Sequence, residues 1–143
     1  MKGADQNHLA NRALYIYIVD DEPMIGEMMD AVFCTQGFRT RVFSEPELAL
    51  ESLSQERIKP DVLLTDFLMG SMNGMDLIDA CRALHPGLRT VLCSGHVNPE
   101  QLSRYPDPAD AFVSKPCLPA ALVGKVREAL ATKDGARMRE VGG

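Results

Sequence analysis

"YIYIVDDEPM", residues 15–24, sets five apolar residues directly before three consecutive acids and a proline. A nearly continuous apolar run of this kind is expected of a strand that is covered on both faces. Two carboxylates about 4 Å apart repel each other by roughly 1 to 4 kcal/mol, depending on the effective dielectric. The crowding of Asp20, Asp21 and Glu22 therefore indicates either a solvated turn whose acids begin a helix, or a cation site.

Four more segments have the pattern of strands. Those at 61–69 (DVLLTDFLM), 89–95 (RTVLCSG) and 110–116 (DAFVSKP) are apolar runs, and the first two are almost uninterrupted. The segment at 38–44 (FRTRVFS) alternates between apolar and polar residues, which predicts an edge strand.

Helical spacing fills the intervals between these strands. Pro23 suits the first turn of the first helix, which should end near Gly37, and Ser44 and Glu47 have capping-box spacing before the second. A weaker segment at 96–109 predicts a short or irregular fourth helix that ends at "PDP". The apolar positions of the other four helices are Ile25, Met28, Met29 and Val32; Ala49, Leu50 and Leu53; Leu77, Ile78, Cys81 and Leu84; and Leu118, Leu122, Val126 and Leu130.

Strands that alternate with helices predict a single α/β domain, a doubly wound five-stranded parallel sheet with right-handed crossovers and helices on both faces. We expect this domain to span residues 13–132. Residues 1–12 and 133–143 lack a sustained apolar face and are expected to be flexible extensions, with no output domain after residue 131. In such sheets, ligands bind beyond the carboxyl ends of the strands, at the switch point.

The composition excludes several classes of partner. The chain has 143 residues, a net charge of −5 and no run of Lys and Arg, so we expect neither a nucleic-acid nor a membrane partner. No apolar stretch approaches the roughly 20 residues of a membrane span, and the N-terminus lacks the apolar core of a signal peptide. The four cysteines are widely separated, which favours small core residues in a reducing cytoplasm over a zinc site.

Polar residues gather at the ends of the predicted strands. The first strand ends in Asp20 and Asp21, the third contains Asp66, the fourth ends in Ser94 and the fifth in Lys115. Three close carboxylates favour a hard cation such as Mg²⁺. A carboxylate can also be the nucleophile of a phosphoryl transfer, and a cation and a lysine can neutralise charge on the transferred group.

This combination resembles the response-regulator receiver domain of two-component signalling. The resemblance rests on DDE at 20–22, Asp66 followed by M-x-x-M-x-G at 69–74, Ser94, and Lys115 with the proline after it. Phe112 stands where the family has a switch aromatic. The match covers about residues 14–131 and implies a flavodoxin-like or CheY-like strand order, 2-1-3-4-5.

The resemblance implies a role for each residue of the site. Asp66 would be the phosphoacceptor. Asp21 and Asp66 would bind Mg²⁺ directly with the backbone carbonyl of Leu68, and Asp20 would act through water. Lys115 would contact the phosphoryl group.

The resemblance also implies a switch. Ser94 would contact the phosphoryl group and let Phe112 turn inward. Leu68 and His96 would flank the approach of water and tune dephosphorylation. The donor would be a sensor histidine kinase or a histidine phosphotransfer protein, and the reader an unknown downstream protein. The chain would be a cytoplasmic monomer or weak dimer that catalyses only its own phosphorylation and dephosphorylation, not an enzyme acting on a metabolite.

Three residues depart from the family pattern. Gly70 replaces the usual proline after the first methionine of the loop, and Asn73 replaces the usual aspartate; both are expected to loosen or neutralise the loop. Gly95 replaces an alanine after the switch hydroxyl and is expected to widen the pocket.

Other functions remain as alternatives. A haloacid-dehalogenase-type phosphatase would need two acids separated by one residue on the first strand and a cap insertion. A flavodoxin-like nucleotide binder would need a phosphate loop rich in Ser, Thr and Gly, where this chain has acids. A receiver-shaped adaptor would bind partners without phosphorylation. His96 could be a phosphoryl-relay histidine, although no dimerising helix motif surrounds it.

Overall fold

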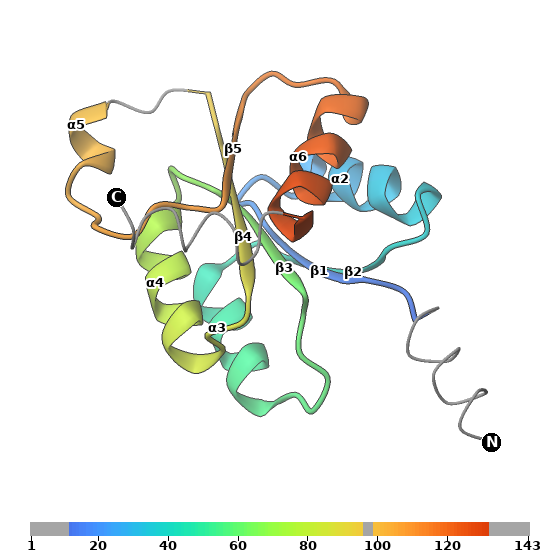
Figure 1. The fold of residues 1–143 in the computed structure, drawn as a ribbon, viewed down its shortest axis with the longest axis horizontal. Coiled ribbons are helices and arrows are strands. Elements are labelled where there is room, and N and C mark those ends of the chain that lie inside the picture. The colour runs from blue at the N-terminus through green and yellow to red at the C-terminus, as the bar shows by residue number, and fades with distance from the viewer. Residues whose placement is uncertain (1–11, 96–98, 132–143) are drawn as a thin grey trace.

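The computed structural model describes residues 12–95 and 99–131, in which strands and helices alternate along the chain (Figure 1). The strands are β1 (Tyr15–Val19), β2 (Arg39–Phe43), β3 (Val62–Asp66), β4 (Arg89–Ser94) and β5 (Ala111–Ser114). The helices are α2 (Pro23–Thr35), α3 (Pro46–Gln55), α4 (Gly74–Leu84), α5 (Pro99–Leu102) and α6 (Pro119–Ala131). Each predicted strand and helix is therefore present at its expected place in the sequence.

The strands form one parallel sheet in the order β2-β1-β3-β4-β5, which confirms the predicted doubly wound topology. The chain passes outward from β1 to β2 and then returns to β3 on the other side of β1, so the winding changes direction between β1 and β3. Val19, the last residue of β1, pairs with Thr65, which precedes Asp66. The acids that follow β1 and the acid that ends β3 consequently meet at the switch point.

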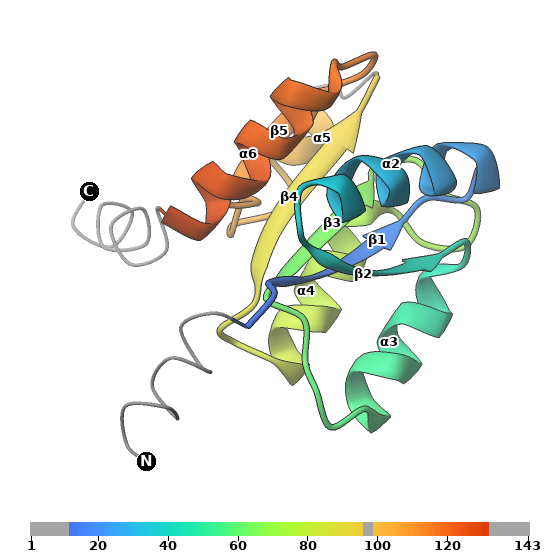
Figure 2. The ribbon, with the colours of Figure 1, turned by 90° about the vertical axis from the view of Figure 1, so that its right-hand side faces the viewer.

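Helices cover both faces of the sheet (Figure 2). Tyr17 and Val19 of β1 pack in a core with α3 and α4, whereas Ile16 and Ile18 pack in a second core with α2 and α6. All five residues of β1 are buried. This arrangement explains why the opening segment is apolar at every position rather than at every second one.

The buried face of α2 differs from the predicted one. Met28 is 45% exposed, and the residues that face the sheet are Gly26, Met29 and Phe33. A Cβ at Gly26 would lie 2.8 Å from the side chain of Val42, so the helix approaches β2 most closely where it has no side chain. A pattern that scores apolar side chains cannot identify a glycine as the centre of a buried face.

Two predicted helix ends are also wrong in detail. Leu118 precedes α6 and is 75% exposed instead of packing in the core. Ser44 and Glu47 do not form a capping box, because α3 begins at Pro46 with Glu45 as its N-cap residue. Proline suits the first helical position, where it sets the helix start one residue too late for Ser44 to cap it. Glu47 instead accepts a hydrogen bond from Ser71.

The predicted short fourth helix is confirmed, since α5 spans four residues. The predicted extensions lie almost entirely outside the described residues; Arg12, within the first of them, forms an ion pair with Asp61 at 2.7 Å. Of the cysteines, Cys81 and Cys93 are buried as expected, and Cys34 is exposed. Among the described helices, none is long and apolar enough to cross a membrane.

Candidate functional site

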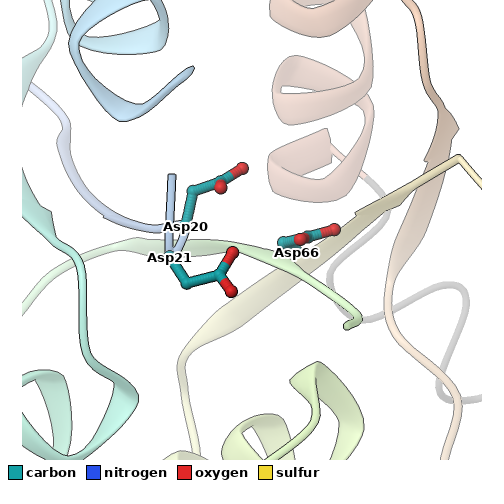
Figure 3. A group of neighbouring side chains, drawn as sticks. All are labelled: Asp20, Asp21 and Asp66. Atoms are coloured by element: carbon teal, nitrogen blue, oxygen red, sulfur yellow. The ribbon is translucent and has the colours of Figure 1, made fainter. Parts of the chain in front are cut away.

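Three carboxylates meet beyond the carboxyl ends of β1 and β3. Asp20 and Asp21 leave β1 side by side, and Asp66 at the end of β3 lies next to them (Figure 3). One oxygen from each lies within 4.8 Å of one oxygen from each of the others. Asp20 is buried, Asp66 is half-buried and Asp21 is exposed. This set of hard oxygen donors suits a divalent cation of the Mg²⁺ class, which accepts carboxylates and retains several waters.

Lys115 brings one positive charge to this cluster. Its Nζ donates a hydrogen bond of 2.9 Å to Oδ2 of Asp20 and lies 3.6 Å from Oδ1 of Asp66. Its backbone N–H donates to the carbonyl of Ser94 at 2.9 Å, which fixes the chain at the end of β5 beside the end of β4. The lysine therefore reaches the acids of the switch point from β5, which lies two strands from β3 and three from β1 in the sheet.

Asp20 accepts hydrogen bonds from the protein with both of its carboxylate oxygens. While Oδ2 accepts from Lys115, Oδ1 accepts a hydrogen bond of 3.0 Å from the backbone N–H of Glu22. The backbone N–H of Asp20 itself donates to the carbonyl of Phe43 at 3.1 Å. Both oxygens of this buried carboxylate thus have partners, as a buried charge requires.

Asp66 is more available. Its Oδ1 accepts a hydrogen bond of 2.9 Å from the backbone N–H of Phe67, and its Oδ2 accepts none from any described residue. Burial raises the pKa of Asp66, and the charges of Asp20 and Asp21 act in the same direction, whereas Lys115 opposes them. A cation placed among the acids would oppose the same repulsion.

Lys115 has the complementary environment. Burial alone would lower the pKa of its ammonium, but the hydrogen bond to Asp20 and the charges of Asp20 and Asp66 together raise that pKa above its ordinary value. Lys115 is thus held in its charged form next to the half-buried carboxylate of Asp66, whose Oδ2 accepts no hydrogen bond from the described part of the chain.

The loop after Asp66 closes tightly on itself. The backbone N–H of Gly74 donates to the carbonyl of Phe67 at 2.8 Å. A Cβ at Gly74 would lie only 2.3 Å from the carbonyl oxygen of Asp66, so the start of α4 packs directly on the backbone of the site. Asn73 caps α4, because its side-chain oxygen accepts from the N–H of Asp76 at 2.8 Å. The expectation that Asn73 loosens or neutralises the loop relative to an aspartate stays a prediction, since an aspartate could form the same cap.

Among the described residues, no hydrogen bond joins the side chains of Ser94, Phe112 or Leu68 to the three carboxylates. Ser94 is buried at the end of β4, beside Ser114 in the sheet. Phe112 is 38% exposed on β5, and Leu68 is 56% exposed in the loop after β3. His96 lies outside the described residues.

Sequence reasoning missed Tyr105. Its hydroxyl accepts a hydrogen bond of 2.8 Å from the side-chain amide of Asn73 and donates one of 2.9 Å to Asp76. Tyr105 stands in the weakly patterned segment between β4 and β5, so no periodicity marked it. The only sequence feature that pointed to this contact was Asn73, where the family more usually has Asp.

Comparisons with known proteins agree with this geometry. The model of the response regulator receiver domain family matches residues 16–127. The DNA-binding response regulator MtrA of Mycolicibacterium smegmatis is 33% identical over 118 residues, which cover 80% of this chain and 50% of that protein. The chain thus spans about half the length of this curated relative.

Two solved structures illustrate the similarity of the fold. A CheY-like response regulator receiver domain protein from Methanospirillum hungatei superposes with a TM-score of 0.76 at 23% identity, covering 87% of this chain and 99% of that one. A response regulator receiver protein from Sinorhizobium medicae gives a TM-score of 0.75 at 25% identity, covering 86% and 98%.

Proposed function

Because the chain belongs to the response regulator receiver domain family, we propose that Asp66 accepts a phosphoryl group from a phosphohistidine. The donor is a sensor histidine kinase or a histidine phosphotransfer protein. The observation that supports this proposal most directly is the Oδ2 of Asp66, which accepts no hydrogen bond from the described residues, in a carboxylate whose Oδ1 lies 3.6 Å from an ammonium.

The transfer uses the residues in distinct ways. An oxygen of Asp66 forms a bond to phosphorus while the phosphorus–nitrogen bond of the donor breaks, and the imidazole leaves with the electron pair and takes up a proton. Lys115 neutralises negative charge on the incoming group. Mg²⁺, held by Asp21, Asp66 and the carbonyl of Leu68, with Asp20 acting through water, would supply further positive charge.

We predict that Mg²⁺ stabilises the domain and that Asp21→Asn removes most of this effect. A ligand that binds only the folded state adds about 2.7 kcal/mol at 100 times its dissociation constant. In metal-free buffer the variant should melt no lower than wild type, because one of three mutually repelling carboxylates is gone. Thermal melts across a Mg²⁺ titration measure this.

Glu22→Gln is the matched control. It removes the neighbouring acid, which lies outside the cluster, and should keep the full response to Mg²⁺. Coincident wild-type melts with and without Mg²⁺ would contradict the metal site.

Phosphorylation would be read by a downstream protein through Ser94 and Phe112. Ser94 is buried one strand away from Asp66, and Phe112 is exposed on the neighbouring strand, so a small movement of one could alter the surface near the other. We propose a cytoplasmic domain that is a monomer or weak dimer. The prediction that this chain binds no nucleic acid remains a prediction, since the relative named as DNA-binding is about twice as long as the matched segment.

The phosphoryl lifetime is proposed to depend on Leu68 and on His96, of which only Leu68 lies among the described residues. Leu68 is exposed beside Asp66, and its apolar side chain cannot orient a water. We expect Leu68→Asn to shorten the half-life of the phosphorylated domain severalfold, as measured by the decay of the phosphorylated fraction. An unchanged half-life would leave Leu68 without this role.

Beryllium fluoride, an analogue of the phosphoryl group, tests the proposal directly. With Mg²⁺ present it should bind to wild type and shift the amide resonances of Lys115, Ser94 and Phe112. Asp66→Asn, which keeps the size of the side chain but removes the carboxylate, should give no shifts. An unchanged wild-type spectrum would overturn the proposed function.

A further inference from the structure

The segment between β4 and β5 contacts the rest of the domain mainly through a few side chains. We call residues 99–110 the α5 segment (Figure 1). Among the described elements, α5 is too short to pack extensively on another helix or strand. Leu102, Tyr105 and Ala109 are only partly buried against the core beneath α4. Specific polar contacts therefore contribute much of the stabilisation that positions this segment.

Among the described residues, two sets of hydrogen bonds attach the α5 segment to α4, one toward each end of the helix. Toward the C-terminus, Arg82 donates to the carbonyls of Asp107 and Pro108 at 3.1 and 2.7 Å. Toward the N-terminus, Tyr105 bonds to Asn73 and Asp76. Only the second set touches the loop that leads from Asp66.

The bonds of Tyr105 have a defined direction. An amide at Asn73 can accept with its oxygen and donate with its nitrogen. The oxygen caps α4 by accepting from the N–H of Asp76, and the nitrogen donates to the Tyr105 hydroxyl. The hydroxyl proton is then free to donate to the carboxylate of Asp76. An aspartate at position 73 could still cap the helix but could not donate to the tyrosine.

These bonds continue to the site through the backbone. Asn73 is followed by Gly74, whose N–H bonds to the carbonyl of Phe67 and whose Cα packs against the carbonyl of Asp66. Tyr105 therefore holds the far end of the loop whose near end is Asp66. A loop that is held at both ends pays less ordering entropy when a ligand binds to it.

We propose that Tyr105 is a positioning residue for Asp66, and that its hydroxyl couples the placement of the α5 segment to the binding of a phosphoryl group. The proposal rests on the proposed function, because the coupling requires an anion that binds at Asp66. Any such coupling acts equally in both directions, so anion binding must also alter the surroundings of Tyr105.

The test measures the dissociation constant of beryllium fluoride at saturating Mg²⁺ by titration of amide resonances. Tyr105→Phe keeps the ring and removes the hydroxyl with its bonds to Asn73 and to the carboxylate of Asp76. We expect binding to weaken about two- to tenfold, the range of one net hydrogen bond. Asn73→Asp keeps the cap and removes the donor, and it should weaken binding at least as much. In wild type, binding should shift the amide resonance of Tyr105.

Arg82→Gln is the control for a merely structural role. It removes the hydrogen bonds to the carbonyls of Asp107 and Pro108 but leaves the bonds of Tyr105 and of Asp110 to Thr90 in place. It should therefore lower the melting temperature while leaving the dissociation constant within twofold of wild type. If Tyr105→Phe also leaves the dissociation constant unchanged, the positioning role is overturned and the proposed function stands. If wild type fails to bind beryllium fluoride, the proposed function falls and this inference falls with it.

Discussion

Gly74→Ala should destabilise the domain by about 2 to 3 kcal/mol, the upper part of the range of about 1 to 3 kcal/mol for a side chain forced into a closely packed site. The added Cβ would lie 2.3 Å from the carbonyl oxygen of Asp66 and 2.8 Å from Leu92. In an ordinary helix the same change stabilises by about 1 kcal/mol, so steric overlap must outweigh helix propensity here. The first contact is with backbone and cannot be relieved by turning a side chain. Denaturant unfolding gives the free-energy difference.

Gly124→Ala provides a control of opposite sign. Gly124 is exposed within α6, and a Cβ there would have no atom within 4 Å. This variant should gain about 0.5 to 1 kcal/mol from helix propensity and reduced chain entropy. If both variants gain stability, the close approach of α4 to the backbone of Asp66 is not real.

Lys115→Met should cost about 2 to 4 kcal/mol in metal-free buffer at neutral pH. Removing one partner of a buried ion pair leaves the other charge without compensation, which typically costs about 3 to 5 kcal/mol. We expect a smaller loss than this typical value because the pair is only partly buried: the side chain of Asp20 is almost fully buried, but that of Lys115 is 24% exposed. Chemical denaturation of the two proteins measures this difference.

A second substitution separates the lost charge pair from lost packing. Asp20→Asn combined with Lys115→Met removes both charges and should recover a large part of the stability lost by Lys115→Met alone. If the double variant is as unstable as the sum of the single variants, the ion pair at 2.9 Å contributes nothing that packing does not.

The fold and the acidic cluster were predictable because both depend on simple regularities. Apolar runs that alternate with helical spacing require a parallel sheet, and a parallel sheet brings the ends of its strands to one edge. Asp20, Asp66 and Lys115 each end a strand or directly follow one, so their convergence follows from topology alone. No side-chain detail was needed to expect it.

The remaining errors arise where a single contact decides the outcome. Gly26 faces β2 because the helix and strand approach closely there, and a glycine contributes nothing to an apolar pattern. Pro46 displaced the start of α3 from the position that Ser44 could cap. Tyr105 acts through one hydroxyl in a segment without periodicity. The spacing of apolar residues predicts which faces of helices and strands are buried. It does not predict which polar atoms form hydrogen bonds between residues that are far apart in the sequence.

The central claim is that Asp66 becomes phosphorylated. Wild-type protein incubated with Mg²⁺ and a phosphohistidine donor should gain the mass of one phosphoryl group, which maps to the peptide containing Asp66 and is released by hydroxylamine, as an acyl phosphate must be. Asp66→Asn should gain nothing under the same conditions. A wild-type protein that gains no phosphoryl group, or a variant that gains as much, would contradict the account.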